Sequence, residues 1–240
     1  RPPLGYRKTV EGLAREDAVR YHADFYRPRN TVVAVVGDEA PEALAARVRR
    51  RFGDWPDPGP ALKPVLPPLA RQTEPRREEV SSASAQSHLL VGHLGIRRAD
   101  PDFLPLLVAD NVLGVGAGFT DRLSRRIRDE LGLAYEVHGS ITRSAAREPG
   151  AFAVYVGTRH ENRETALTEI RELLARFVRE GPTEEEVAEA KAFLLGSYVF
   201  DYETAGSLAG HLVAVERFGL GLDYLARYPS RVAAVTREDA

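Results

Sequence analysis

Residues 113–135 read LGVGAGFTDRLSRRIRDELGLAY, and this stretch decides how the rest of the chain is interpreted. Its pattern predicts a glycine-rich loop over 114–118, then a helix with a basic face, then a strand that opens at Tyr135. Arg128 and Tyr135 stand on either side of a break at Gly132. Both side chains donate hydrogen bonds, and neither is an ordinary acid or base at neutral pH. Such a pair is suited to polarising a group that another part of the molecule holds.

The periodicity of this stretch predicts which side chains share a face. An apolar residue recurs at every fourth position of the helix, at Phe119, Leu123, Ile127 and Leu131. In the strand that follows, alternation places Tyr135, Val137 and Ile141 on one face. The glycine loop follows a helix pattern rather than a strand and lacks the lysine of a phosphate-binding loop, so a nucleotide site is not indicated.

The sequence offers no group that would carry out covalent or metal chemistry by itself. Cysteine is absent, which excludes a thiol nucleophile, a disulfide and a cysteine-based metal site. The six histidines form neither H-E-x-x-H nor H-x-x-E-H. His88 and His93 lie in an apolar run that reads as a strand, and their spacing directs them to opposite faces. We therefore expect no zinc site from this chain alone.

Composition limits the class of protein. The net charge is −2, so a nucleic-acid surface is not indicated. No apolar run approaches the ~20 residues of a membrane span, and no signal peptide opens the chain, so a cytoplasmic location is expected. The chain begins with Arg1 rather than methionine. We expect it to be part of a longer protein, with a genuine short protein as the alternative.

Proline divides the chain into three regions. Residues 1–53 should form a first unit and residues 78–240 a second, larger one. The range 54–77 between them is rich in proline. Proline cannot donate the hydrogen bonds of a helix or a strand ladder, so an extended linker is expected there.

The expected elements follow from periodicity, caps and breaks. In chain order they are a helix over 15–25, a buried strand over 30–37, a helix over 41–52, a strand over 85–95, a helix over 101–113, strands over 135–141 and 149–157 that form a hairpin, a long helix through 167–177, a helix that continues to 198, and helical segments over 208–218 and around 224. Thr183 and Glu186 have the spacing of a capping box, which predicts where the helix to residue 198 starts.

A short repeat suggests an internal duplication. Residues 13–18 read LAREDA and residues 235–240 read VTREDA. Both follow a connecting segment and open a helix pattern, so the second copy would begin a helix like the first. A chance match of short charged words is the alternative.

Several short motifs occur here in the order and spacing of one known family. The pieces are Leu113-Gly114, Asp121-Arg122-Leu123, Arg128-Asp129-Glu130, Gly132-Leu133-Ala134-Tyr135, Phe25-Tyr26-Arg27-Pro28-Arg29-Asn30 with Gly37-Asp38, and Thr183-Glu184-Glu185-Glu186 with Ala190-Lys191. They resemble the C-terminal half of the pitrilysin/insulinase-type (inverzincin) zinc metallopeptidases, which include the mitochondrial processing peptidases. Ser124 departs from the family pattern, which often has phenylalanine there.

The resemblance implies an α+β fold with two duplicated halves, each a mainly antiparallel sheet with helices packed on one face. The first copy would be incomplete. Residues 1–53 would be the rear part of the N-terminal half, 54–77 the linker, and 78–240 a C-terminal half that is truncated at its end. The family's zinc ligands would lie upstream of Arg1 or in a partner subunit.

The resemblance also implies roles for Arg128 and Tyr135. In the family these residues bind the substrate carbonyl and the oxyanion that develops during peptide hydrolysis, while the zinc is held elsewhere. The implied partners are a peptide substrate and a peptidase-family subunit in a homodimer or heterodimer. Without the resemblance, Arg128 would be read as pairing with a neighbouring acid, and Tyr135 as packing beside Val137.

Two other functions stay open from the sequence. The chain could be a non-catalytic subunit, structural or regulatory, that pairs with a zinc-bearing partner. It could also be a domain that binds peptides as added strands.

Overall fold

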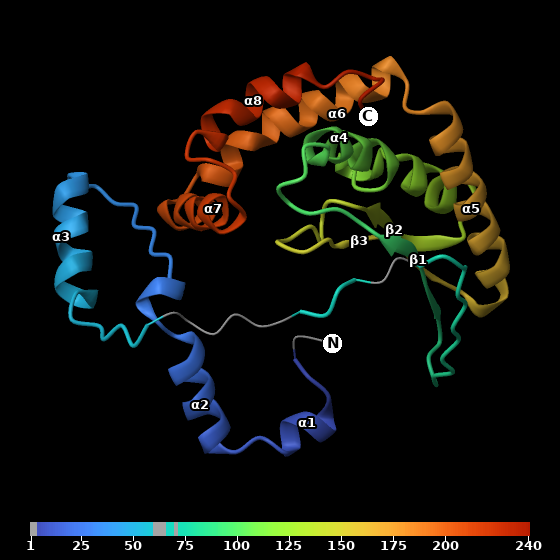
Figure 1. Cartoon of the computed structure of the whole chain (residues 1–240). Coiled ribbons are helices and arrows are strands. Elements are labelled where there is room, and N and C mark those ends of the chain that lie inside the picture. The colour runs from blue at the N-terminus through green and yellow to red at the C-terminus, as the bar shows by residue number, and fades with distance from the viewer. Residues whose placement is uncertain (1–3, 60–65, 70–71) are drawn as a thin grey trace. The chain divides into compact units, whose positions relative to one another are not determined.

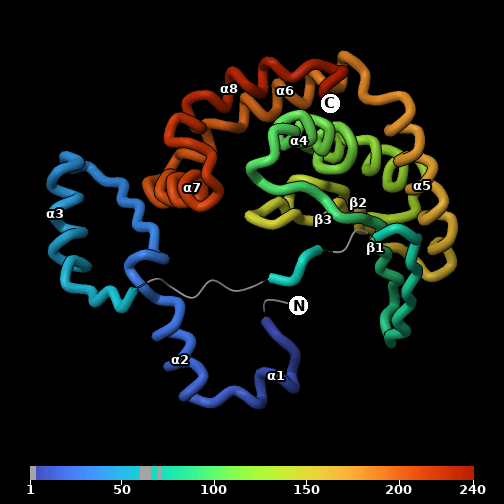
Figure 2. The backbone as a smooth tube through the Cα atoms, viewed as in Figure 1, coloured from blue at the N-terminus to red at the C-terminus, as the bar shows by residue number. Residues whose placement is uncertain are grey.

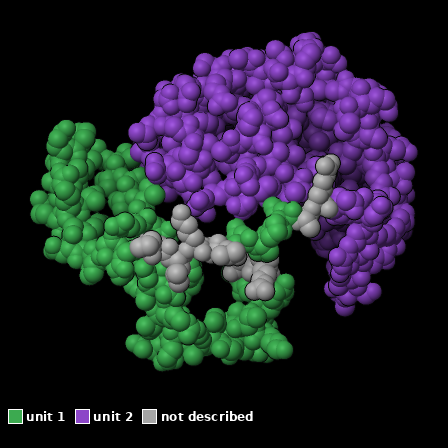
Figure 3. Space-filling view, viewed as in Figure 1, with its two compact units in different colours: residues 1–69 green, residues 70–240 purple. Residues whose placement is uncertain are grey.

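The computed structural model describes residues 4–59, 66–69 and 72–240 (Figure 1). The chain divides into two compact units, residues 1–69 and 70–240, which Figure 3 colours separately. The division falls within the proline-rich range 54–77. Part of that predicted linker lies outside the described residues.

The first unit consists of short helices joined by extended segments. They are α1 (Arg7–Glu11), α2 (Arg15–Phe25), the 3₁₀ turn η1 (Pro28–Asn30) and α3 (Pro41–Phe52). The predicted helices over 15–25 and 41–52 are confirmed. Asp17 accepts a hydrogen bond from the Ala14 main-chain N–H at 3.0 Å, and Pro41 occupies the first position of α3, where no N–H is needed.

The predicted buried strand over 30–37 is wrong. Residues 31–37 lie in no helix or strand, and Val32, Val33 and Val35 remain 46%, 48% and 45% exposed. A strand is stable only when a neighbouring strand pairs with its backbone, and no described strand pairs with this segment. The apolar, β-branched composition of the segment therefore sets its preference for extended backbone without burying it.

The second unit contains a three-stranded antiparallel sheet. Its strands are β1 (Ser87–Leu94), β2 (Ala134–Ser140) and β3 (Ala151–Thr158), in the order β1-β3-β2. The predicted strands and the β2–β3 hairpin are confirmed. Val154 and Val156 on the central strand are completely buried, whereas Tyr155 between them points to the other face and is half-buried. One face of the sheet is thus the core face.

Helices make up much of the rest of the second unit. They are α4 (Phe103–Leu113), α5 (Arg163–Glu180), α6 (Glu184–Ser197), α7 (Ala205–Phe218) and α8 (Tyr224–Ala234), with a π-helical segment η3 (Ser124–Glu130) and the 3₁₀ turns η2 (Ala117–Phe119), η4 (His160–Asn162) and η5 (Tyr198–Tyr202). Figures 1 and 2 show α6 and α8 running side by side over α4. None of the described helices is long and apolar enough to cross a membrane.

Two apolar clusters hold the second unit together. In the first, Ile170 of α5 and Ile127 of η3 pack against Val154 and Val156 of the sheet. The second joins α4, α6 and α8 through buried residues that include Val108, Val187 and Val232. Each fully buried side chain of this size stabilises the fold by about 1.5–3 kcal/mol. The predicted α+β class, with a mainly antiparallel sheet and helices on one face, is confirmed.

Local caps reproduce two patterns that the sequence predicted. Thr183 and Glu186 form the capping box at the start of α6, with N–H donations in both directions at 2.7 and 3.2 Å. The 235–240 segment copies the hydrogen bond of residues 14–17, since the Thr236 N–H donates to Asp239 at 2.9 Å. This bond to the main chain lowers the pKa of Asp239. In both copies of the repeat, the aspartate side chain therefore accepts a hydrogen bond from the main-chain N–H three residues earlier.

Candidate functional site

The glycine-rich loop 114–118 lies directly on β2. The Gly139 N–H donates to the Gly114 carbonyl at 3.1 Å. A Cβ added at Gly114 would stand 2.5 Å from the Gly139 nitrogen, and one at Gly116 would stand 2.8 Å from the Asn111 carbonyl oxygen. These glycines are required because two backbones approach closely, which agrees with the absence of a phosphate-binding loop.

The segment after the loop is held by a buried carboxylate. Asp121 accepts hydrogen bonds from the Ser124 N–H at 2.8 Å and the Ser124 hydroxyl at 2.9 Å. Burial raises the pKa of Asp121 above its ordinary value. Leu123 and Ile127 point into the core and are completely buried. This arrangement anchors the start and the inner face of η3, which carries Arg128.

The predicted regular helix with a four-residue apolar seam is only partly correct. Leu123 and Ile127 are core residues, but Phe119 lies in the preceding turn η2 and is half-exposed. Residues Ser124–Glu130 form a π-helix, in which the Leu131 N–H reaches back to the Arg126 carbonyl at 3.2 Å. Leu123 and Ile127 still share the core face, and Phe119 leaves it because it belongs to the turn η2, which ends before the π-helix begins.

A β-bulge at the start of β2 decides where Tyr135 points. Ala134 pairs with Thr158 and Glu136 pairs with Gly157, so Tyr135 is the extra residue on its strand. Ala134 and Val137 are both buried, whereas Tyr135 is 81% exposed. The predicted alternation, with Tyr135 on the face of Val137, is therefore wrong. The bulge directs the phenol away from the core.

In the structure, the guanidinium of Arg128 contacts two aromatic rings, those of Phe119 and Tyr135. The guanidinium carbon of Arg128 lies 3.9 Å from the ring centre of Phe119 and 5.2 Å from that of Tyr135. The Nε of Arg128 is 3.7 Å from a carboxylate oxygen of Asp129, which is a loose ion pair. Phe119 is the site residue that the sequence analysis missed, because it was assigned to the buried seam.

The hydrogen-bonding groups of this pair are available. Within the part of the chain that the structure describes, neither the Arg128 guanidinium nor the Tyr135 hydroxyl donates to an acceptor. Of the two alternative interpretations, the pairing of Arg128 with a neighbouring acid is observed as the loose ion pair with Asp129, whereas Tyr135 is exposed and does not pack beside the buried Val137. The arrangement can donate several N–H groups and one O–H group to an acceptor that arrives from outside.

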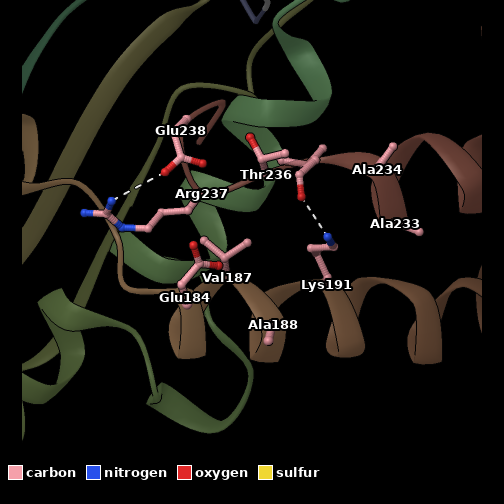
Figure 4. Close-up of a pocket in the computed structure, with 10 residues that line it drawn as sticks. Glu184, Val187, Ala188, Lys191, Ala233, Ala234, Thr236, Arg237 and Glu238 are labelled. Carbon is pink, nitrogen blue, oxygen red and sulfur yellow. Dashed lines mark hydrogen bonds and ion pairs between the residues drawn. The ribbon is translucent and has the colours of Figure 1, made fainter.

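A concavity lies elsewhere in the second unit. It is a hollow of about 380 Å³ between the start of α6 and the chain that follows α8 (Figure 4). Lys191 donates to the Val235 carbonyl at 2.7 Å, and Arg237 donates to the carbonyls of Pro182 and Glu180 at 2.8 and 3.0 Å. Because the side chains of Lys191 and Arg237 already bind main-chain oxygens, they connect structural elements, and we assign no ligand to this hollow.

The described residues do not fit a zinc ion. Among them, no group of three or more histidine, cysteine, aspartate or glutamate side chains could hold a metal. The Nδ1 of His88 lies 2.8 Å from the Tyr155 hydroxyl, and the Nδ1 of His93 lies 2.7 Å from the Leu94 carbonyl. Each histidine therefore has a local partner of its own.

Comparison with known proteins agrees with the motif pattern. The family profile described as the peptidase M16 inactive domain matches residues 12–194. The chain belongs to this family. The resemblance to zinc metallopeptidases is thereby confirmed for the family, and the matched range includes Phe119, Arg128 and Tyr135.

Curated relatives of this M16 domain include proteins with different names. An uncharacterized zinc protease of Streptomyces coelicolor is 30% identical and is matched over 100% of this chain and 52% of its own length. A non-peptidase homolog, YmxG of Helicobacter pylori, is 24% identical over 92% of this chain and 50% of its length. The chain thus spans about half the length of these relatives.

A solved structure shares the fold. The crystal structure of a peptidase M16 inactive domain from Pseudomonas fluorescens superposes with a TM-score of 0.85 at 29% sequence identity. The match covers 98% of this chain and 55% of the other. This M16 domain therefore belongs to a group of zinc-protease-like proteins whose members include both named proteases and a named non-peptidase.

Proposed function

We propose that this M16 domain binds the peptide substrate of a zinc-protease-like protein through Arg128 and Tyr135. Both side chains would donate hydrogen bonds to one peptide carbonyl oxygen. The observation that carries the proposal is the placement of the Arg128 guanidinium within 5.2 Å of the exposed Tyr135 ring. Among the described residues, the guanidinium has a loose ion pair with Asp129, and no hydrogen bond is found from either side chain to an acceptor.

The chemistry of peptide hydrolysis gives this pair a role beyond affinity. When a carbonyl carbon is attacked, negative charge develops on its oxygen. A cation and a phenol already aimed at that oxygen stabilise the charge without reorganising at the transition state. Among the described residues, no group of three or more histidine, cysteine, aspartate or glutamate side chains could hold a zinc ion. The group that activates the attacking water would therefore come from another part of the protein or from a partner subunit of the same family.

A second candidate function is a binding subunit without peptidase activity. The relative named a non-peptidase homolog supports it, since this chain aligns with about half of that protein. Arg128 and Tyr135 would then hold a peptide without contributing to its cleavage. The two functions share the site and differ in whether a carbonyl bound there is also attacked.

The deciding experiment uses the full-length protein, alone and mixed with its family partner, on a fluorogenic peptide library. Arg128→Ala and Tyr135→Phe should each lower kcat by about 10²–10³ and change KM less. Arg147→Ala is the matched control, because it removes an exposed positive charge from the β2–β3 connection of the same unit.

The outcomes separate the candidates. A fall in kcat for the two site variants supports the catalytic role. Loss of peptide affinity in the site variants, with no cleavage by any preparation, supports the binding subunit. If both variants cleave and bind as the wild type does, Arg128 and Tyr135 have no role in substrate recognition, and any peptide bound would be held by another surface, such as a strand edge.

A further inference from the structure

Phe119 has an unusual backbone conformation. Its φ angle is +67°, and it is the one non-glycine residue with positive φ in the part of the chain that the structure describes. A bulky side chain rarely adopts this left-handed conformation, because Cβ meets the following carbonyl oxygen. Such strain persists where the surroundings enforce it, and it is found preferentially at functional sites.

The surroundings of Phe119 enforce the conformation from both sides. The N–H and the hydroxyl of Thr120 both donate to the Ala117 carbonyl, at 3.3 and 2.9 Å, which closes the turn η2. Upstream, Gly116 is wedged between Asn111 and the buried Asp121. The backbone of this turn therefore has little conformational freedom, and it fixes the position of the Phe119 ring.

That position is the face of Arg128. The ring of Phe119 is 50% exposed, so its placement does not serve the apolar core. Instead the ring centre lies 3.9 Å from the guanidinium carbon of Arg128, within the range of a cation–π contact. Tyr135 approaches the same guanidinium from 5.2 Å. Two rings thus restrict the orientation of the cation while its donors stay available.

A second arginine in the same unit shows what such an arrangement looks like when it is structural. The guanidinium carbon of Arg98 lies 3.8 Å from the Phe103 ring and 5.2 Å from the Tyr224 ring. There, the rings are only 7% and 6% exposed, and Arg98 donates to the Tyr224 hydroxyl at 2.9 Å. Around Arg128 the distances are similar, but Phe119 and Tyr135 are exposed, and among the described residues Arg128 donates no hydrogen bond to the Tyr135 hydroxyl. The Arg128 arrangement is therefore open to a ligand.

We infer that Phe119 is a positioning residue that holds the plane of the Arg128 guanidinium toward the substrate carbonyl. The inference rests on the proposed function of Arg128. The side chain of Arg128 is 26% exposed, and the contact with the ring restricts its remaining rotamer freedom before a substrate arrives. Phe119 acts through Arg128 and does not itself donate to the reacting atoms.

The test is a double-mutant cycle in the full-length protein with its partner. Phe119→Gly removes the ring and suits the positive φ, so the turn should survive. We expect kcat to fall about tenfold in the wild-type background and to change by less than about twofold in an Arg128→Ala background. Phe119→Trp, which keeps an aromatic face for the cation, should restore most of the lost rate.

Peptide affinity gives a second readout if the protein cleaves nothing. The dissociation constant for a fluorescent peptide should rise in Phe119→Gly only when Arg128 is present. Thermal melting of each variant separates this effect from loss of folding, because a positioning role predicts a melting temperature within a few degrees of the wild type.

Two results would overturn the inference. One is an equal effect of Phe119→Gly in the presence and absence of Arg128, which would indicate an independent or purely structural role. The other is a Phe119→Gly variant as active as the wild type while Arg128→Ala and Tyr135→Phe are impaired. In that case the proposed function stands and only the role of Phe119 fails. Unimpaired Arg128→Ala and Tyr135→Phe variants would instead remove the proposed function.

Discussion

The guanidinium of Arg122 and the carboxylate of Glu186 form a two-bond ion pair, with oxygens at 2.7 Å from Nε and 2.6 Å from a terminal nitrogen. Both side chains are mostly buried, at 17% and 22% exposure. Glu186 also closes the capping box with Thr183, and Arg122 donates to the Gly181 carbonyl at 3.1 Å. The pair therefore ties the chain just before Arg128 to the junction of α5 and α6.

This pair predicts a pH-dependent contribution to stability. Its hydrogen bond from Arg122 lowers the pKa of Glu186 below the ordinary value of about 4.3. The stabilisation is therefore complete above about pH 5 and is lost as the pH falls through the lower, folded-state pKa. Glu186→Gln should cost about 2 kcal/mol in the free energy of unfolding at pH 7, and progressively less as the pH falls toward 2. Urea unfolding over this pH range measures the difference.

The control for that measurement is Glu184→Gln. Glu184 occupies the same first turn of α6, and no hydrogen bond or ion pair to an arginine is found for it among the described residues. It should lose only a few tenths of a kcal/mol, from its interaction with the helix dipole. Equal losses for the two variants at pH 7 would show that the Arg122 pair contributes nothing.

Two glycines of the loop, Gly114 and Gly118, should differ in how much an alanine substitution destabilises the unit. At Gly114, an added Cβ meets the backbone of Gly139 at 2.5 and 2.7 Å, so Gly114→Ala should destabilise the unit by about 2–3 kcal/mol. At Gly118, nothing lies within 4 Å and only the φ of +63° opposes a side chain, so Gly118→Ala should cost about 1 kcal/mol. Thermal unfolding of both variants compares the two costs. The reverse order would contradict the close approach of the loop to β2.

The stability of the second unit should depend strongly on the buried carboxylate of Asp110. It accepts hydrogen bonds from the Ser140 hydroxyl at 2.6 Å, the Ile141 N–H at 2.9 Å, and the N–H and hydroxyl of Thr142 at 2.9 and 2.5 Å. Asp110→Asn would turn an amide N–H₂ toward these donors and should cost about 3 kcal/mol. Chemical denaturation measures it, with the exposed Asp102→Asn on the same stretch as the control. A loss no larger than that of the control would be incompatible with this network.

Removal of the exposed Tyr135 hydroxyl should lower the rate of catalysis without lowering the stability of the fold. Because Tyr135 is 81% exposed at a bulge, Tyr135→Phe should leave the melting temperature nearly unchanged while kcat falls about 10². Tyr155→Phe is the matched control, since that hydroxyl lies on the same sheet and already contacts His88 at 2.8 Å. Steady-state kinetics and thermal melting of the two variants form the test. An equal fall in kcat for both would assign the effect to the sheet and not to the Tyr135 hydroxyl.

Most elements of the fold could be predicted because their causes are local. The start of α6 follows from the Thr183–Glu186 capping box, and the start of α3 follows from Pro41. Strand β3 follows from its alternating apolar residues. By contrast, the apolar segment over 30–37 was assigned to a buried strand, and burial depends on a pairing partner that residue preference does not supply.

The candidate site was predictable in its residue types and not in its geometry. The chemistry of Arg128 and Tyr135 and the family resemblance point to these two residues, and the structure places the guanidinium carbon of Arg128 5.2 Å from the Tyr135 ring centre. Phe119 was assigned to the core because its spacing from Leu123 fits an α-helix. The periodicity rule assumes 3.6 residues per turn and an unbroken strand alternation, and η3 and the β2 bulge violate both assumptions.

The amino-acid order alone indicated most of the helices, the three strands of the sheet and the residue types of the donor pair, because each depends on residue chemistry or on neighbours within a few positions. Tertiary packing decided the rest. The buried anchor residues Leu123 and Ile127 hold a π-helical turn against the sheet, and the bulge turns Tyr135 outward. The guanidinium carbon of Arg128 then lies 3.9 Å from the ring centre of Phe119 and 5.2 Å from that of Tyr135. The local turn η2 holds the strained backbone of Phe119, whereas the position of η3 and the direction of Tyr135 depend on long-range contacts with the sheet.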